Sequence, residues 1–564
     1  MRSLDPDVVV IGGGVGGCAA ALALCRSGYH VVLTEETGWI GGQLTSQMVP
    51  PDEHGWIEQF GCTASYRRFR DGVRQYYRDY YPLLPPHRED PRLNPGNAWV
   101  SPLCHEPGVA LAVLEAMLAP EISRGRLLVL RHHVPVGLDL ESSDRVRSID
   151  VENLSNGSRC RLRAQYFLDA TENGDLLPMA GAEYVTGSES RRETGEPNAP
   201  DRPEPGNVQA FSTCFVLEER AGESHIIDPP ASYDFWRSYL PKLTPPWPGP
   251  LLSWEGVNPR TMEARRYEFD PHGEDPSRCT GLWSYRRIID RTLFEPGFFT
   301  SDLCLVNWPM IDYMEANLLD CSVAERTRRL ARGRELSLSA IHWLQTEAPR
   351  PDGGQGWPGL RLRGDLAGTP DGLAMAPYIR ESRRIKTIYL ISEQDVSARC
   401  RPRETFAAPY EDSVGIGHYR IDLHPTTGGD NYIDIEALPF QIPLGALIPV
   451  RMENLIPSAK NIGTTHITNG CYRLHPVEWN IGESAGLLVA FCLDRKKLPR
   501  EVRADAHLLE HFQQFLQAEG VELVWPGDLD LHDGDPHRHM TREPSCLPPL
   551  PPETTREYTP LNVL

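Results

Sequence analysis

The chain has 564 residues, which is too long for one simple hydrophobic core and predicts two or three domains. Its hydrophobic content of 40% is enough to form such cores and excludes a largely disordered chain. The formal net charge of −20 argues against nucleic acid or an anionic membrane as the main partner.

The 13 cysteines are scattered, with no CxxC pair and no cysteine/histidine group at zinc spacing. We therefore expect reduced thiols and no metal site. No run of 18 apolar residues occurs, and Asp5 and Asp7 directly precede the first apolar run. We expect neither a membrane span nor a secretory signal. We therefore expect a cytoplasmic protein.

Residues 7–36, DVVVIGGGVGGCAAALALCRSGYHVVLTEE, predict a strand, a tight turn, a helix and a second strand. Val8 to Ile11 form a continuous apolar run, as expected of a strand buried on both faces. An Ala/Leu-rich stretch to Arg26 predicts the helix, and Val31 to Thr34 predict the second strand.

Glycines at GxGxxG spacing lie between the first strand and the helix. Gly12 permits a tight turn, Gly14 lets the backbone approach a pyrophosphate, and Gly17 lets the helix pack on the strand. The helix start offers N–H groups and a positive dipole end to phosphates, and Glu35 can accept hydrogen bonds from ribose hydroxyls. A glycine-rich turn without a ligand is the alternative. The predicted dinucleotide-binding residues here are Gly12, Gly14, Val15, Gly16, Gly17, Glu35 and Glu36.

Three later segments resemble cofactor motifs of the glutathione-reductase-like flavoproteins. TGWIGGQLT is similar to a segment that runs along the pyrophosphate of FAD, and DATENGDLLPMAG (169–181) is similar to a motif that returns the chain to FAD. LLVLRHHVPV (127–136) is similar to the strand that presents backbone to the adenine. The resemblance implies contacts to FAD from Gly41, Gly42, Gln43, Leu44, Thr45, Val134, Ala170, Thr171 and Asp175.

The segments GGQLTSQMVPPDEHGWIEQFG, SPLCHEP, DATENGDL, PYIRESRRI, DSVGIGHYRIDLHPT and NGCYRLHPVEWNIGESAG together resemble the FAD-dependent oxidoreductase family, which is related to the fumarate reductase and succinate dehydrogenase flavoproteins. The match covers about residues 7–500. It implies an α/β fold, in which a discontinuous Rossmann-like FAD-binding domain carries an inserted α+β substrate or cap domain. The expected divisions are 1–185 and 431–500 for the FAD-binding domain, 186–430 for the insert, and 501–564 for a C-terminal helix and proline-rich tail.

The remaining elements follow from local patterns. QAFSTCFVLEE (209–219) predicts a strand, residues 322–347 predict one long amphipathic helix, and residues 446–463 predict apolar strands separated by turns. ADAHLLEHFQQFLQAEG (504–520) predicts a helix near the end of the chain. No second GxGxxG follows a strand, so we expect no built-in NAD(P)H domain.

HPVEWNIGESAG, residues 475–486, predicts that the chain returns to the cofactor late in the sequence. Asn480 to Gly486 is expected to open a helix whose start points at the N1/C2 carbonyl edge of the flavin. Gly482 would allow that approach, and Asn480, Ile481 and Gly482 are the predicted cofactor contacts. An ordinary buried helix with small residues for packing is the alternative.

The candidates for catalysis come from remote segments, and spacing does not assign the base among them. His54, with Asp52 and Glu53, follows the flavin-contacting segment, or else these are solvent-exposed loop charges. Arg380 and Arg383 would share one helix face at i, i+3 spacing, to bind a substrate carboxylate or to pair with internal acids.

Two further groups of ionisable residues are candidates for the pocket. In one extended strand His418, Arg420, Asp422 and His424 would point the same way, which favours His424 as a pocket residue. His475 or Arg473 could hold a positive charge near the pyrimidine end of the flavin.

The predicted function is oxidation of a C–H/O–H or C–H/N–H bond of a small polar metabolite, with hydride transfer to flavin N5. Dioxygen or a separate carrier would reoxidise the FAD. A flavin-dependent monooxygenase with a separate reductase is the first alternative, and a non-catalytic flavin-binding protein is the second. The pattern leaves the substrate and the oligomeric state open.

Overall fold

The computed structural model describes residues 2–273 and 281–531 of the chain. At its centre is a five-stranded parallel sheet with the order β23-β8-β2-β3-β4. Its strands are β2 (Val8–Ile11), β3 (Val31–Glu35), β4 (Leu127–Arg131), β8 (Tyr166–Asp169) and β23 (Leu455–Pro457). The late strand β23 pairs with β8, which pairs with β2, so the sheet is built from remote parts of the chain.

Both faces of this sheet are buried, which explains the continuous apolar run in β2. Val8 and Val10 pack in one core with residues of α1 (Val15–Arg26), α4 (Pro107–Ser123) and α13 (His475–Arg495). Val9 and Ile11 pack in another core with a four-stranded sheet of order β1-β7-β6-β5. That sheet consists of β1 (Arg2–Leu4), β5 (His133–Ser142), β6 (Arg145–Asn153) and β7 (Arg159–Arg163). The predicted Rossmann-like arrangement is confirmed.

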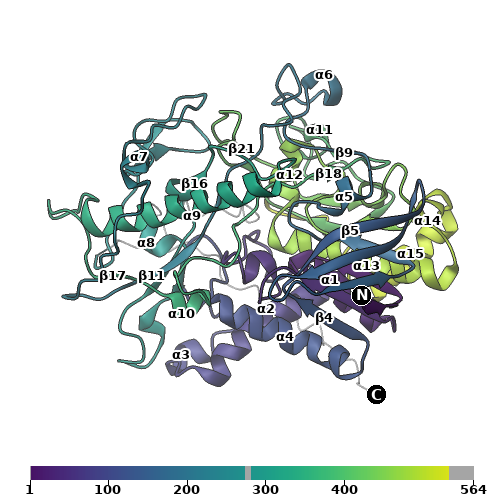
Figure 1. The fold of residues 1–564 in the computed structure, drawn as a ribbon, viewed down its shortest axis with the longest axis horizontal. Helices are drawn as coiled ribbons and strands as arrows, with labels where there is room; N and C mark the ends of the chain where they lie inside the picture. Colours follow the sequence, from purple (N-terminus) through teal and green to yellow (C-terminus); the bar gives the residue numbers. More distant parts are fainter. Residues whose placement is uncertain (1, 274–280, 532–564) are drawn as a thin grey trace.

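A second group of elements lies beside this unit, on the left in Figure 1. Its antiparallel sheet has the order β14-β15-β11-β17 and is formed by β11 (Phe215–Glu219), β14 (Arg287–Ile289), β15 (Leu303–Val306) and β17 (Leu360–Leu362). The predicted long helix is confirmed as α9 (Val323–Thr346), with Ser322 and Glu325 forming a capping box at its start. The core of this group is made almost entirely of residues 210–379. The inserted α+β part of the fold prediction is therefore confirmed, whereas its boundaries at 186 and 430 remain predictions.

The other elements are shorter or peripheral. The helices are α2 (Ala64–Tyr80), α3 (Pro85–Arg88), α5 (Leu176–Met179), α6 (Arg191–Thr194), α7 (Tyr233–Ser238), α8 (Leu282–Tyr285), α10 (Gly364–Ala367), α11 (Glu393–Val396), α12 (His466–Tyr472), α14 (Pro499–Ala504) and α15 (Ala506–Ala518). Four 3-10 turns lie at η1 (Gly42–Leu44), η2 (Arg291–Leu293), η3 (Pro309–Ile311) and η4 (Leu444–Leu447). The remaining strands are β9 (Tyr184–Val185), β10 (Phe211–Ser212), β12 (Glu255–Val257), β13 (Ala264–Arg266), β16 (Asp312–Tyr313), β18 (Arg384–Ile385), β19 (Ser413–Gly417), β20 (Ile421–Leu423), β21 (Ile433–Ile435) and β22 (Phe440–Pro443).

Several predicted strands differ from the observed ones. Residues 127–136 form two strands in different sheets, because His132 adopts a left-handed φ of 59° between β4 and β5. Residues 209–219 likewise split into β10 and β11, which belong to separate sheets. Within 446–463 only β23 is a strand. The helix predicted over 504–520 is α15, which starts after the cap residue Asp505. The predicted proline-rich end lies largely outside the described residues.

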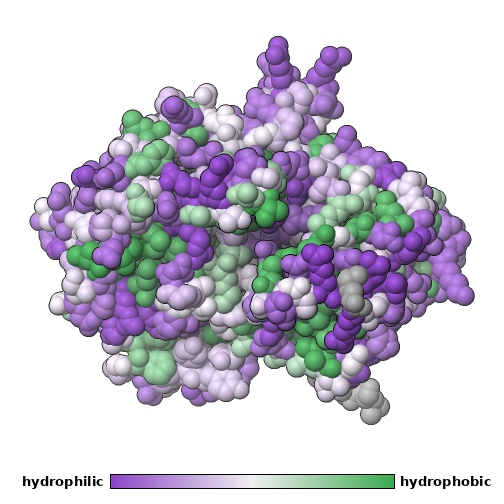
Figure 2. Space-filling model, in the orientation of Figure 1, coloured by the Kyte–Doolittle hydropathy of each residue, from purple (hydrophilic) through white to green (hydrophobic). Residues whose placement is uncertain are grey.

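The surface drawn in Figure 2 is mainly hydrophilic, and its apolar side chains form separate patches. No helix of the described residues is long and apolar enough to cross a membrane.

Candidate active site

The predicted glycine turn lies against the motif that follows β8. Gly12 has a φ of +103°, and a Cβ atom on it would lie 2.3 Å from the carbonyl oxygen of Ala170, so only glycine fits there. The Gly12 N–H donates to Thr34 Oγ1 at 3.2 Å. In the motif, Asp169 accepts from Thr171 N–H and Oγ1 at 3.0 and 2.7 Å, which fixes the turn. Gly12, Ala170 and Thr171 are thus brought together as predicted.

The start of α1 lies at the centre of the predicted cofactor cradle. Gly14 caps the helix without a side-chain hydrogen bond, so the first N–H groups point out of the helix end beside Val15, Gly16 and Gly17. A Cβ atom on Gly16 would lie 2.0 Å from the carbonyl oxygen of Ser458, and one on Gly17 would lie 1.9 Å from that of Gly12. The late segment after β23 therefore closes over the early glycine turn.

An acid ends β3, as predicted. Glu35 accepts hydrogen bonds from Thr37 N–H and Thr37 Oγ1 at 2.8 and 2.7 Å. Burial raises the pKa of Glu35 to about 7, although these hydrogen bonds oppose the shift. Glu36 follows it and is exposed. Val134 lies in β5, three residues after Arg131, which pairs with Glu35 in the sheet.

Asp175 is held in the middle of the motif, where its N–H donates to Thr171 Oγ1 at 2.7 Å. Its carboxylate pairs with Arg383 at 3.1 Å and with Arg326 at 3.5 Å. Arg383 also pairs with Asp320 at 2.9 Å, so it is directed away from Arg380.

The segment 41–45 connects the cradle with the interior of the protein. Gly41 and Gly42 both have positive φ, and the Gly41 N–H donates to the Gly13 carbonyl at 2.7 Å. The Gln43 amide donates to the Arg473 carbonyl at 3.1 Å, while Oε1 of Gln43 is buried without a hydrogen-bond partner. Thr45 Oγ1 donates to the Ile40 carbonyl at 2.6 Å and Leu44 is buried, so this turn is rigidly held.

The late helix differs from its prediction, because it starts at His475 rather than at Asn480. Asn480, Ile481 and Gly482 lie inside α13, and a Cβ atom on Gly482 would lie 2.1 Å from the Gly16 carbonyl oxygen. The small residues thus serve the packing of α13 on α1, which was the alternative interpretation. The expectation that residues 12–17 and 480–486 fold together is confirmed.

These features fit FAD. The cradle has glycines where a side chain would collide, N–H groups at a helix start that suit a pyrophosphate, and an acid placed for ribose hydroxyls. Gln43 connects the cradle with Arg473, and its buried Oε1, which has no hydrogen-bond partner, adds a polar group there. Which of these residues contact the cofactor remains a prediction.

A buried polar cluster lies beyond Arg473, and we call it the Asp312 cluster. It consists of Asp312, Ser212, Arg380 and His424. Asp312 in β16 accepts from His424 Nδ1 at 2.6 Å and from Ser212 Oγ at 2.5 Å, and it pairs with Arg380 at 3.0 Å. Burial raises the pKa of Asp312, but Arg380 and His424 outweigh burial and hold this pKa below its usual range. An ionised Asp312 can only accept a hydrogen bond, so Nδ1 of His424 must donate to it. In its neutral form the His424 ring therefore carries its proton on Nδ1 and has a lone pair on Nε2.

Arg473 extends this cluster toward the segment 41–45. It donates to Tyr378 Oη at 2.8 Å and to the carbonyl and Oδ2 of Asp422 at 2.9 and 3.2 Å. Asp422 Oδ2 is 3.8 Å from His424 Nε2, so it joins Arg473 to the Asp312 cluster. The side chains of His424 and Asp422 are 20% and 22% exposed, which makes them the accessible part of an otherwise buried group.

His475 holds a loop rather than a charge. Its Nδ1 accepts from the Asp52 N–H at 3.0 Å, and Nε2 lies 3.1 Å from the Val49 carbonyl, so Nε2 carries the proton. Burial lowers the pKa of His475 to about 3, and the ring stays neutral. Asp52 pairs with Arg286 at 2.9 Å. Of the two residues proposed to hold a positive charge, only Arg473 does so.

The remaining predictions need correction in part. Asp52, Glu53 and His54 are buried rather than exposed, but His54 contacts the Gly61 carbonyl at 3.1 Å and packs with Trp56 and Trp525, away from the Asp312 cluster. Burial lowers the pKa of His54 to about 3.

Two predicted geometries are wrong. Residues around Arg380 form no helix, so Arg380 and Arg383 bind different internal acids, as the alternative stated. His418 lies outside β19 and β20 and packs on Trp56, while Arg420 pairs with Asp434. Of that group, Asp422 and His424 lie close together.

The sequence did not single out Asp312, Ser212 or Arg286. Asp312 is a lone acid between apolar residues in WPMIDYM, and a buried acid of this kind needs a partner. That pattern was the available signal, but its partners are far away in the chain.

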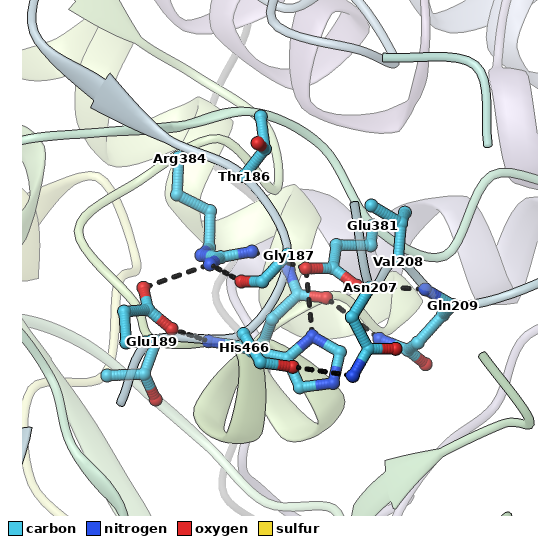
Figure 3. Close-up of polar contacts among 12 residues, drawn as sticks. Thr186, Gly187, Glu189, Asn207, Val208, Gln209, Glu381, Arg384 and His466 are labelled. Carbon is cyan, nitrogen blue, oxygen red and sulfur yellow. Dashed lines mark hydrogen bonds and ion pairs between the residues drawn. The ribbon is translucent and has the colours of Figure 1, made fainter. Parts of the chain in front are cut away.

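Figure 3 shows a second network of polar side chains, and Gln209 links it to this cluster. His466 Nδ1 lies 3.0 Å from Glu381 Oε1, and Arg384 pairs with both Glu381 and Glu189. Glu381 accepts from the Gln209 N–H at 3.0 Å, and Gln209 Oε1 accepts from the His424 N–H at 3.3 Å. This network therefore supports the main chain at His424.

We expect the His466–Glu381 contact to stabilise the fold most between about pH 4.5 and 6.5. Burial lowers the pKa of His466, but Glu381 raises it overall above its ordinary 6.5, so this contribution is complete below 6.5 and is lost as the pH rises through the folded pKa. Burial raises the pKa of Glu381, yet His466 and Arg384 hold it at about 2 instead of 4.5. That contribution is complete above 4.5 and is lost as the pH falls toward 2.

The measurement is the free energy of unfolding of the native protein and of His466→Asn across this pH range. The variant should lose about 1–3 kcal/mol within the window, since it leaves Glu381 with one buried partner fewer. His507→Asn, at an exposed histidine of α15, is the control. A loss that is equal at all pH values would contradict the assignment.

Comparison with known proteins places this geometry in a family. The model of the family described as FAD dependent oxidoreductase matches residues 7–516. A comparison with curated proteins found no match. Among solved structures, the quinol fumarate reductase FrdA of E. coli is 10% identical over 92% of this chain and 74% of that chain, with a TM-score of 0.29.

Two other solved structures are similar over shorter stretches. The flavin-dependent monooxygenase PieE is 12% identical over 69% of this chain and 52% of that chain, with a TM-score of 0.27. The L-proline dehydrogenase of P. horikoshii is 15% identical over 33% of this chain, with a TM-score of 0.17, and the match spans 24% of the dehydrogenase chain. Such low scores carry no argument about the reaction. The family match, however, covers nearly the whole chain, and the chain belongs to the FAD dependent oxidoreductase family, with FAD as its cofactor.

Proposed function

We propose that this protein oxidises a C–H/O–H or C–H/N–H bond of a small polar metabolite at the Asp312 cluster. The bound flavin supplies a hydride acceptor at N5. Dioxygen or a separate carrier would then take the electrons. The observation that carries this proposal is the 2.6 Å contact between Asp312 and His424, because it gives a partly exposed histidine the tautomer of a general base.

His424 would take the O–H or N–H proton of the substrate at Nε2. Asp312 acts as a positioning residue, which holds the ring and stabilises the imidazolium that forms. Ser212 and Arg380 keep Asp312 ionised and in place, since both contact its carboxylate. The base must be accessible to the substrate, and the residue that positions it can be buried. The His424 side chain is 20% exposed and the Asp312 side chain is fully buried, which suits these two roles.

Arg473 and Tyr378 would bind the polar group of the substrate. Tyr378 Oη accepts from Arg473 at 2.8 Å, so its own hydrogen is left to donate to a substrate oxygen or nitrogen. Burial raises the pKa of Tyr378, which keeps this hydroxyl protonated at neutral pH. The fixed charge of Arg473 favours a substrate that carries or develops a negative charge.

The test is anaerobic reduction of the purified holoprotein by a panel of small hydroxy and amino metabolites. Loss of the oxidised-flavin absorbance with a panel member, without NAD(P)H, is the expected result. Reduction by NAD(P)H alone, followed by incorporation of oxygen into a product, would replace the proposal by a monooxygenase. A flavin that nothing in the panel or NAD(P)H reduces would indicate a non-catalytic flavin-binding protein.

A further inference from the structure

A carboxylate lies over the glycines of the cofactor cradle. Cβ atoms on Gly14 and Gly42 would lie 2.8 and 2.9 Å from Glu172 Oε1. Gly14 caps α1, and Gly42 begins η1, within the segment that is predicted to run along the pyrophosphate. The side chain of Glu172 therefore stands where phosphate oxygens are expected to approach the backbone.

A single buried lysine holds this carboxylate. Lys460 is fully buried and pairs with Glu172 Oε2, and its Nζ is 3.7 Å from Glu478 Oε2. Burial lowers the pKa of Lys460, but Glu172 and Glu478 outweigh burial and raise it above its usual value, so the ammonium is charged. The chain has five lysines, and this one is placed at the start of α1 by the turn after β23.

The second carboxylate is fixed in place. Glu478 accepts a hydrogen bond from the Gln43 amide, and its side chain is 1% exposed. Glu172 is 23% exposed, and its carboxylate pairs with Lys460. Of the two acids beside Lys460, Glu172 is thus the more exposed one, and it can swing toward solvent while Glu478 stays buried.

A pyrophosphate would compete with Glu172 for the same partners. Both are anions that suit a helix start and a buried ammonium, but they cannot lie between Gly14 and Gly42 together. We propose that Glu172 closes the cradle in the cofactor-free protein, and that the FAD pyrophosphate displaces it and takes over Lys460. This exchange concerns cofactor uptake and does not depend on the reaction proposed above.

Glu172→Gln tests the exchange, because it keeps the shape of the side chain and removes its charge. We expect FAD to bind about tenfold more tightly and to leave more slowly, the factor that follows if the closed form makes up about 90% of the cofactor-free protein. The measurements are the rate of FAD release from the holoprotein into a flavin-binding trap, and the affinity of the deflavinated protein for FAD by fluorescence quenching. Thermal unfolding should show a less stable cofactor-free variant and a holoprotein at least as stable as the native one.

Two further variants separate the competing interpretations. Lys460→Met should weaken FAD binding, whereas Lys460→Arg should largely keep it, since the charge remains. Glu183→Gln, at an acid paired with Arg451 on the surface, is the matched control and should change neither the release rate nor the affinity. If Glu172→Gln leaves FAD affinity unchanged or weakens it, Glu172 is a permanent part of the holoprotein site and the exchange is wrong.

Discussion

Replacing His424 by asparagine is expected to lower the rate of substrate-driven flavin reduction by about 10²–10⁴-fold, the usual contribution of a general base. The loss arises because no other partly exposed base in the Asp312 cluster has its protonated nitrogen fixed by a buried acid. FAD should stay bound, since His424 contacts Asp312 and Gln209 and not the residues of the cradle. The measurement is single-turnover anaerobic bleaching, expressed per bound flavin.

The role of Asp312 gives an internal check on that result. Asp312→Asn should slow reduction less than His424→Asn and should shift the pH profile, because an amide can hold the ring in the wrong tautomer. His342→Asn, at a histidine of α9 that contacts the Ile227 carbonyl at 2.9 Å, is the matched control and should leave the rate unchanged. If His424→Asn retains the native rate, the base is elsewhere, and Asp422 is the next residue to test.

Gly482→Ala is expected to lower the free energy of unfolding by about 1–3 kcal/mol and to weaken FAD binding. The added Cβ atom would lie 2.1 Å from the carbonyl oxygen of Gly16 and 2.5 Å from its Cα atom. These are main-chain atoms, so the contact can be relieved only by moving α13 away from α1. Such a movement displaces the N–H groups at the start of α1, and stability and affinity should fall together.

Chemical denaturation and FAD titration of the same preparations measure both effects. Gly108→Ala is the control, because this glycine lies in α4 and a Cβ atom on it would meet nothing within 4 Å beyond its chain neighbours and the backbone of its own helix. That variant should be as stable as the native protein or slightly more so. A native affinity for FAD in Gly482→Ala would show that α13 does not set the position of the phosphate-binding turn.

The cofactor end of the protein could be predicted from the sequence because its signals are local. A buried parallel strand needs a continuous apolar run, a close backbone approach needs glycine, and both occur within residues 8–17. The long helix α9 could also be predicted from the sequence, because its capping box and its apolar positions lie within a single element. Boundaries were less certain. The break at His132 depends on one left-handed residue. The helix α13 starts at His475, with Pro476 in its first turn, five residues before the predicted start.

The amino-acid sequence by itself determined the class of fold, the cofactor and the residue types offered to it. Only the tertiary structure decided which candidates act together. It joined His424 to Asp312, 112 positions away. It made His475 a neutral residue that holds the loop at Val49 and Asp52, and it placed His54 against Trp525 in an aromatic cluster. It also placed Glu172 beside Lys460, 288 positions later. The physical reason is that a buried charge must find its partner in space, and sequence patterns extend over one element at a time.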